Sequence, residues 1–229
     1  MTTYQVLVSV HGAIGVIALV TFWSNAVLRK GTTLHRRVGR VFLLAMTGIL
    51  ATATPMAWFA FRSGRPVTAA FLAYLVVITA VAVWCQWRAI RDQDDVVRYT
   101  GPVYVGPGVL SLLSGLAVLV LGIRVGAPLL MGFSVVGLAS GAEHIYKRRH
   151  RAQLGARRDW WLVEHYNAVL GNGIATHIAF LSIGLPRLLP SAGGGVLTTL
   201  AWFGPLLVAV IAKVLIDRRW KPRTLVQAS

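Results

Sequence analysis

Ionisable side chains fall inside segments that are otherwise strongly apolar: His11, Glu143, His144, Glu164, His165 and His177. Three asparagines lie in the same kind of segment: Asn25, Asn167 and Asn172. Ionisable groups are costly to bury in a membrane span, so they are functional candidates by default. Imidazole and carboxylate groups bind haem or metal ions, and they also donate and accept protons. The sequence therefore predicts a cofactor site or a proton-transfer site within a membrane.

The histidines separate into two groups by depth in the membrane. His144 ends one apolar segment and His165 begins the next, each directly after a glutamate, whereas His11 and His177 lie toward the opposite side. His165 and His177 are separated by about 18 Å along a helix that rises ~1.5 Å per residue. This separation suits two stacked haem groups with these four histidines as axial ligands. The pattern predicts a cofactor-bearing redox protein, with haem b as the candidate cofactor.

Two polar residues share a helix face with His165. Asn172 and Thr176 return to within about 20° of its direction when each residue turns the helix by ~100°. A stripe of this kind faces protein or water rather than lipid. In the redox hypothesis, Asn172 and Thr176 hydrogen-bond around the ligand and fix the orientation of its imidazole.

The inner group of residues supports a second hypothesis, a metal-dependent or acid/base enzyme that acts on a lipid-soluble substrate. Glu143 and Glu164 would be the catalytic residues. His144, His165 and His35 would bind zinc or iron, with His35 reaching the site from the basic loop before the second apolar segment. The chain contains no His-Glu-x-x-His or His-x-x-x-His spacing, which is typical of zinc sites.

Two further interpretations remain open. In a small-solute or proton transporter, the same glutamates and histidines would relay protons. In a structural role, the histidines would hydrogen-bond neighbouring helices, and the glutamates would pair with arginines at the membrane surface. Many transporters contain an inverted repeat, and none is visible between the halves of this chain.

The elements that must position these residues are membrane helices. Of the 229 residues, 56% are hydrophobic and 13% are charged, and the mean hydropathy is +0.66. This composition predicts an all-α, polytopic membrane helix bundle with seven transmembrane helices in a single integral membrane domain, residues 1–229. The predicted spans are 4–28, 41–61, 66–87, 105–123, 127–146, 160–185 and 195–216.

Basic residues set the expected orientation, because Lys and Arg near the ends of spans are retained on the cytoplasmic side. We expect the N-terminus outside and the C-terminus inside. Only four of the 23 Lys and Arg residues then fall on the outer side: Arg62, Arg65, Arg124 and Arg187. The fifth and sixth spans meet at the cytoplasmic surface, where we expect His144 and His165 to face each other.

The excess of basic residues also bears on partners. The formal net charge is +16, which in a soluble protein would indicate a nucleic-acid partner. Here the basic residues flank apolar runs and leave no water-soluble basic face, so no nucleic acid is expected. We expect the basic loop 147–158 to contact anionic lipids, and the loop 88–98 to be a solvated, partly self-paired turn. Cys85 is the single cysteine, which excludes an internal disulfide, and the sequence sets no oligomeric state.

Two stretches of the sequence resemble a broad group of bacterial multi-pass membrane proteins of unknown function. The first, residues 11–39, contains His11-Gly12, Lys30-Gly31 and His35-Arg36-Arg37. The second, residues 165–180, contains Gly171, Ile174, Ala175, Ala179 and Phe180. The resemblance implies a multi-pass protein of the bacterial cytoplasmic (inner) membrane. It implies no activity, cofactor or substrate.

Overall fold

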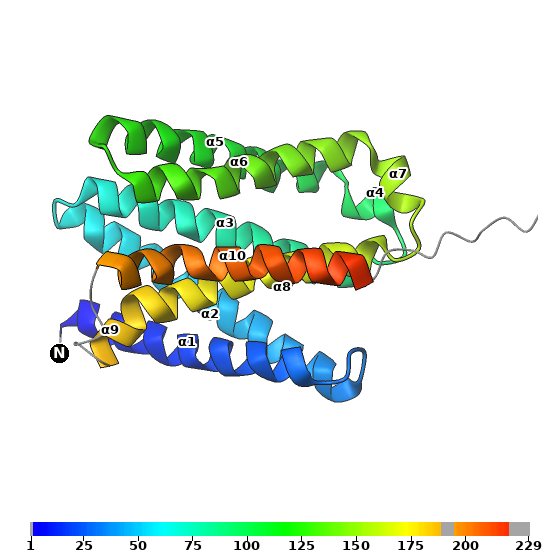
Figure 1. Ribbon diagram of the computed structural model, residues 1–229, viewed down its shortest axis with the longest axis horizontal. Coiled ribbons are helices and arrows are strands. Elements are labelled where there is room, and N and C mark those ends of the chain that lie inside the picture. The colour runs from blue at the N-terminus through cyan, green and yellow to red at the C-terminus, as the bar shows by residue number, and fades with distance from the viewer. Residues whose placement is uncertain (1, 189–194, 220–229) are drawn as a thin grey trace, which may run out of the picture. The chain divides into compact units, whose positions relative to one another are not determined.

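Every regular element in the described part of the chain is a helix, as predicted. The structure is a computed structural model that describes residues 2–188 and 195–219 (Figure 1). In chain order the elements are α1 (Thr3–Val27), α2 (Thr33–Arg62), α3 (Pro66–Arg91), α4 (Val96–Tyr99), α5 (Pro102–Val125), α6 (Pro128–Arg149), α7 (Arg151–Gly155), α8 (Trp160–Ala179), the π-helix η1 (Phe180–Gly184), α9 (Leu185–Leu188) and α10 (Gly195–Arg219).

Six helices in the described ranges are long and apolar enough to cross a membrane: α1, α2, α3, α5, α6 and α10. The sixth predicted span is occupied by α8 and η1. This segment is helical, as expected, but α8 is not among the six apolar candidate spans, and it carries polar residues such as Glu164, His165 and Asn172.

The helices extend beyond the apolar runs that predicted them. α2 begins at Thr33 instead of residue 41, because Thr32 caps it by accepting a hydrogen bond from the His35 backbone N–H (3.2 Å). The expected loop 147–158 is also largely helical, since α6 continues to Arg149 and α7 begins at Arg151. Charged residues end an apolar run without ending a helix, so composition underestimates helix length.

Proline and glycine mark several helix ends. Pro66, Pro102 and Pro128 occupy first-turn positions, where the missing N–H costs no helical hydrogen bond. α5 ends at Gly126, which has a φ of 63° in the left-handed region that glycine tolerates best.

Contacts divide the chain into two compact units, Met1–Thr176 and His177–Ser229. In the first unit the long helices pack in sequence, α1 on α2, α2 on α3, α3 on α5 and α5 on α6 (Figure 1). The α5–α6 contact is close because of small residues. A Cβ added at Gly141 would lie 2.6 Å from the Leu112 Cβ, and one at Gly115 would lie 2.9 Å from the Leu138 backbone nitrogen. In the second unit, Lys213 and Asp217 of α10 form an ion pair (2.8 Å).

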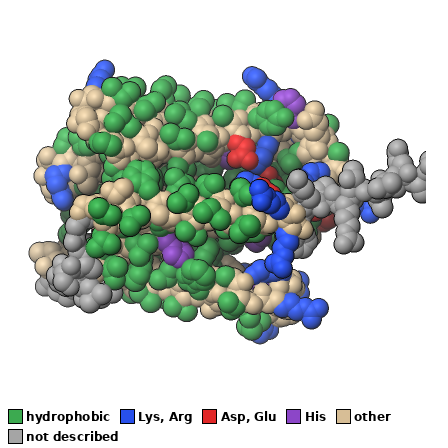
Figure 2. All heavy atoms as spheres, viewed as in Figure 1, with side chains coloured by type: hydrophobic (Ala, Val, Ile, Leu, Met, Phe, Trp, Pro, Cys, Tyr) green, Lys and Arg blue, Asp and Glu red, His purple; other side chains and the backbone are tan. Residues whose placement is uncertain are grey.

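The surface of the helices is apolar along their lengths. Figure 2 shows hydrophobic side chains over the middle of the helices, with Lys and Arg gathered toward the helix ends. Leu44 and Ile123, for example, are 72% and 62% exposed. Helices of this kind suit a bilayer, where backbone polar groups are satisfied within the helix and lipid covers the apolar side chains. The protein is therefore a multi-pass membrane protein.

Candidate functional site

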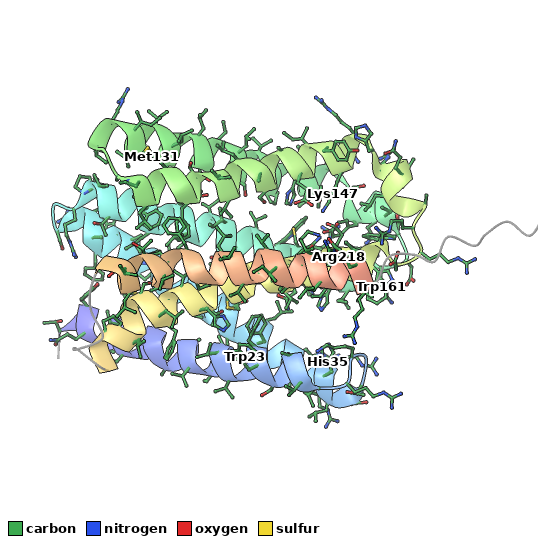
Figure 3. All side chains as sticks on the ribbon, in the orientation of Figure 1. Trp23, His35, Met131, Lys147, Trp161 and Arg218 are labelled. Atoms are coloured by element: carbon green, nitrogen blue, oxygen red, sulfur yellow. The ribbon has the colours of Figure 1, made fainter. Side chains whose placement is uncertain are left out.

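Two glutamates from different helices share one lysine at the end of the first unit that contains α4 and α7 (Figure 3). The Lys147 Nζ lies 2.6 Å from Glu143 Oε1 and 2.6 Å from Glu164 Oε1. Tyr99 donates its hydroxyl hydrogen to the other oxygen of the Glu164 carboxylate, Oε2, at 3.1 Å. Glu143, Lys147, Glu164 and Tyr99 form the Lys147 cluster.

Helix geometry brings the members of this cluster together. Glu143 and Lys147 are one turn apart on α6, so their side chains lie on the same face. Glu164 lies near the start of α8, and α8 begins at the end of the bundle where α6 finishes. Tyr99 is the last residue of α4.

The short helix α4 is held in place by a buried ion-pair network. Asp92, whose side chain is fully buried, pairs with Arg88 and also with Arg98, where the Nε–Oδ1 distance is 3.1 Å. Asp95 caps α4 by accepting a hydrogen bond from the Arg98 backbone N–H (2.8 Å). The predicted self-pairing of this turn is therefore present at Asp92, but its carboxylate is buried between two arginines and is not solvated.

The members of the cluster differ in their contact with solvent. The Glu164 side chain is 6% exposed, whereas that of Glu143 is 52% exposed and that of Lys147 is 16% exposed. Burial and the neighbouring Glu164 carboxylate raise the pKa of the Tyr99 phenol well above its usual value, so Tyr99 remains a hydrogen-bond donor. Two carboxylates for one ammonium leave the ionised cluster with one net negative charge. Binding a single proton makes the cluster neutral.

His144 lies beside this cluster, in an aromatic environment. Its ring stacks on Tyr104 with 4.5 Å between ring centroids. Its Nδ1 lies 2.8 Å from the Ser140 carbonyl oxygen, which places the proton of the neutral ring on Nδ1. Nε2 then accepts a hydrogen bond from the Cys85 thiol, at 3.4 Å. Gly108 makes room for the ring, since a Cβ there would lie 2.4 Å from the His144 Cβ.

A buried stripe runs along α8 from the cluster into the bundle. Glu164, Ala168, Asn172 and Thr176 recur every fourth residue, and all are buried. Asn172 Nδ2 donates to the Oε1 of Gln86 on α3 (2.7 Å). The polar members, Glu164, Asn172 and Thr176, form the α8 stripe. His165, which the sequence predicts at the head of this stripe, contacts the same α3 residue as Asn172, since its Nδ1 lies 3.3 Å from the Gln86 backbone oxygen.

His165 and His35 each hydrogen-bond a neighbouring helix. His165 is half-buried and donates from Nδ1 to the backbone oxygen of Gln86 on α3 (3.3 Å). His35 Nδ1 accepts a hydrogen bond from the side-chain amide of Asn25 on α1 (3.2 Å), in the amide orientation in which the Asn25 oxygen accepts from the Gly39 backbone N–H.

The two histidines predicted to lie toward the outer side belong to different units. His11 of α1 hydrogen-bonds through Nδ1 to the hydroxyl oxygen of Thr52 on α2 (2.8 Å). Thr52 donates its own hydrogen to the Gly48 carbonyl oxygen (2.9 Å), so it accepts from His11. His177 is the first residue of the second unit. The structure does not relate these two histidines to each other.

The described residues give limited support to the predicted cofactors. No group of three or more His, Cys, Asp or Glu side chains in these ranges is arranged to hold a metal ion, so His35, His144 and His165 do not form a three-ligand site. Neutral His144 has both ring nitrogens engaged and could bind a haem iron only by losing its contact with Cys85. His144 as arranged therefore fits a hydrogen-bonded network better than it fits a haem ligand.

Several residues of the site were not singled out from the sequence. Lys147 was counted with the basic loop, although its spacing of four from Glu143 is a signal for an ion pair on a helix. Gln86 and Tyr99 gave no signal, because their roles depend on contacts between distant segments.

Comparison with family models, curated proteins and solved structures finds no match for the chain. The chemistry of the site is therefore inferred from its own geometry.

Proposed function

We propose that the protein is a proton-transferring protein of the bacterial inner membrane, most simply a proton transporter. The observation that carries this proposal is the buried Glu164 carboxylate, which shares Lys147 with the solvent-exposed Glu143. One carboxylate is thus in contact with water, the other is enclosed, and a single ammonium group connects them. This arrangement suits the exchange of one proton between solvent and the interior of the bundle.

The cluster has two states that differ by one proton. With both carboxylates ionised it carries one net negative charge, which is costly to keep inside a bundle. Protonation of Glu164 makes the cluster neutral and leaves Lys147 paired with Glu143. Tyr99 stabilises the ionised state of Glu164 by donating to Oε2.

The proposed topology has seven spans, with α8 and η1 as the sixth, the N-terminus outside and the C-terminus inside. The distribution of Lys and Arg supports this orientation, which places the Lys147 cluster at the cytoplasmic side. From there the α8 stripe leads toward the outer half of the membrane. Its length from Glu164 to Thr176 is about 18 Å at ~1.5 Å per residue.

The haem redox protein and the metal-dependent or acid/base enzyme are less well supported. Both would use His144 or His165 as ligands, and the His144 ring already hydrogen-bonds Ser140 and Cys85 through its two nitrogens. Anionic lipids at the basic cytoplasmic segments are compatible with each of these functions. In the proposed orientation, the arginines at the end of α6 and on α7 lie at the leaflet that carries such lipids.

Proton flux into vesicles tests the proposal. The purified protein is reconstituted with a pH-sensitive dye inside, and a potassium gradient with valinomycin provides the driving force. We expect proton flux above that of protein-free vesicles. Glu164→Gln should reduce it by about tenfold or more, as for removal of a proton-transfer group.

A matched control is Asp217→Asn, which breaks the ion pair between Lys213 and Asp217. These residues are four apart, like Glu143 and Lys147, but the Asp217 side chain is 42% exposed. Asp217→Asn should leave the flux unchanged. Wild-type flux no greater than that of protein-free vesicles would overturn the proposal. So would a folded Glu164→Gln variant with wild-type flux.

A further inference from the structure

Asn172 is completely buried, yet one of its two polar atoms is unsatisfied. Its side chain is 0% exposed, and its Oδ1 has no hydrogen-bond partner among the described residues. Its Nδ2 is fixed by the hydrogen bond to Gln86 Oε1 (2.7 Å). A buried amide oxygen normally accepts at least one hydrogen bond, from protein or from ordered water.

The neighbouring donors are already used. Thr176 donates to the backbone oxygen of Asn172 (2.9 Å) and approaches Met46 Sδ at 3.4 Å. His165 Nδ1 is directed at the backbone oxygen of Gln86. Neither of these donors reaches Asn172 Oδ1, so the oxygen retains the capacity to accept a hydrogen bond from a bound molecule.

Asn172 also lies where several helices of the first unit converge. Its α8 neighbour Gly173 faces α1, since a Cβ there would lie 2.6 Å from Phe22, and Gly171 faces Ala82 of α3. Met46, which Thr176 contacts, belongs to α2. Lipid cannot satisfy Oδ1 in such a position, because lipid chains offer no hydrogen-bond donor.

We propose that a water molecule binds at Asn172 Oδ1, and that this water belongs to a chain of waters that takes the proton from Glu164 across the intervening ~12 Å and passes it toward Thr176. The transfer of a proton through this water rests on the proposed function. The binding of the water rests only on the unsatisfied Asn172 Oδ1. Water is the ligand of choice because it donates to Oδ1 and can pass a proton to a second water or to a hydroxyl. Asn172 thereby positions the water and is not itself ionised. The nearest hydroxyl of the α8 stripe is that of Thr176.

Chemical accessibility tests hydration without relying on transport. Asn172→Cys is made in a Cys85→Ser background, which retains a hydrogen-bond donor beside His144, and is treated with a small charged methanethiosulfonate. The matched control is Ser134→Cys, because Ser134 is also 0% exposed but donates its hydroxyl to the Met131 carbonyl oxygen (2.6 Å). We expect Asn172→Cys to react about tenfold faster than the control. The reactive form of cysteine is the thiolate, and a thiol in contact with water reaches this form more readily than a thiol in a dry interior. Equal, slow reaction of both would overturn the hydrated site.

Flux then tests the relay in the vesicle assay. Asn172→Leu keeps the volume but removes the oxygen, and should lose at least as much flux as Glu164→Gln. Asn172→Asp keeps an acceptor and should retain flux, and Ser134→Ala should behave as wild type. Folding is checked by the thermal midpoint of unfolding. If the role of Asn172 is only structural, Asn172→Leu should lower this midpoint but leave the flux per folded molecule unchanged.

The outcomes separate the two proposals. If Glu164→Gln loses flux and Asn172→Leu keeps it, the relay is wrong and the proposed function stands. If wild type shows no flux, the proposed function fails, and the thiol reactivity still decides whether Asn172 is hydrated.

Discussion

The Lys147 Nζ lies 2.6 Å from Glu164 Oε1, so an almost fully buried carboxylate on α8 is paired with an ammonium group on α6. Among the described contacts, no other ammonium group of α6 reaches this carboxylate. Charges removed from water stabilise a fold only if they are well compensated. Here Lys147 compensates two carboxylates at once, and the second, Glu143, is half-exposed. The pair therefore reaches the surface of the helices through one partner, unlike an ion pair sealed in a core.

Removing Lys147 should destabilise the protein more than removing the pair. Lys147→Leu leaves Glu164 buried without its counter-charge, and we expect a loss of about 3 kcal/mol of unfolding free energy. The double variant Lys147→Leu with Glu164→Leu should recover much of this loss. Lys213→Leu, which breaks an exposed pair, should cost about 1 kcal/mol or less. Denaturant unfolding in detergent measures these differences, and equal losses for the single and double variants would contradict the reasoning.

Gly108→Ala should disturb His144 specifically. The added Cβ would lie 2.4 Å from the His144 Cβ, and we expect a loss of about 1–3 kcal/mol from overpacking. Gly106→Ala on the same helix is the matched control, since a Cβ there meets nothing within 4 Å. It should be neutral or slightly stabilising, because alanine favours helix over glycine. The melting temperature of Gly108→Ala should therefore fall relative to wild type, while that of Gly106→Ala should stay the same or rise. Equal changes in the two variants would show that Gly108 is not needed for the packing of His144.

Tyr99 should make stability fall at alkaline pH. Burial and the Glu164 carboxylate raise the pKa of its phenol in the folded state above the unfolded value of about 10. The stability gained from the neutral phenol is therefore fully present below about pH 10, and it is lost as pH rises through the folded pKa. In Tyr99→Phe this part of the alkaline loss should disappear. Unfolding free energies between pH 9 and pH 11 measure it, and identical pH profiles for the two proteins would contradict the assignment.

The helices could be predicted from the sequence because apolar length is a strong signal. Their ends could not, because Thr32 starts α2 well before its apolar run, and Arg149 lies in α6 after its own run has ended. Backbone hydrogen bonds continue through charged residues at a membrane surface, so hydropathy alone cannot find the boundary.

The site was predicted in part. Glu143 and Glu164 were identified because carboxylates are costly inside spans, and the structure brings both to Lys147. The contacts of Tyr99 and Gln86 could not be foreseen, since they depend on which helices become neighbours. The face shared by His165, Asn172 and Thr176 followed from helical periodicity, and His165 and Asn172 both contact Gln86 of α3. The burial of Glu164 could not be foreseen from that spacing, because it depends on the contacts of Lys147 and Tyr99.

Thiol labelling should establish the proposed topology. Val125→Cys, at the end of α5, should be labelled by a membrane-impermeant reagent added outside intact cells, and Ala156→Cys, after α7, only after the cells are opened. Both positions are exposed, and the native Cys85 is buried and should remain unlabelled. The expectation follows from the retention of basic residues on the cytoplasmic side. Labelling of Ala156→Cys from outside would reverse the orientation and place the Lys147 cluster at the opposite surface.

The absorption spectrum separates proton transfer from the haem hypothesis. We expect no Soret band from protein purified after growth with a haem precursor, because neutral His144 has both ring nitrogens engaged, one by Ser140 and one by Cys85. If a band is found, His165→Ala should abolish it under the redox hypothesis, while His150→Ala, at the junction of α6 and α7, should leave it unchanged. Such a result would assign His165 to a cofactor and would remove the main structural reason for preferring a hydrogen-bonded network. If the band is absent and Glu164→Gln still abolishes proton flux, the buried carboxylate acts without a haem, as the geometry of the Lys147 cluster predicts.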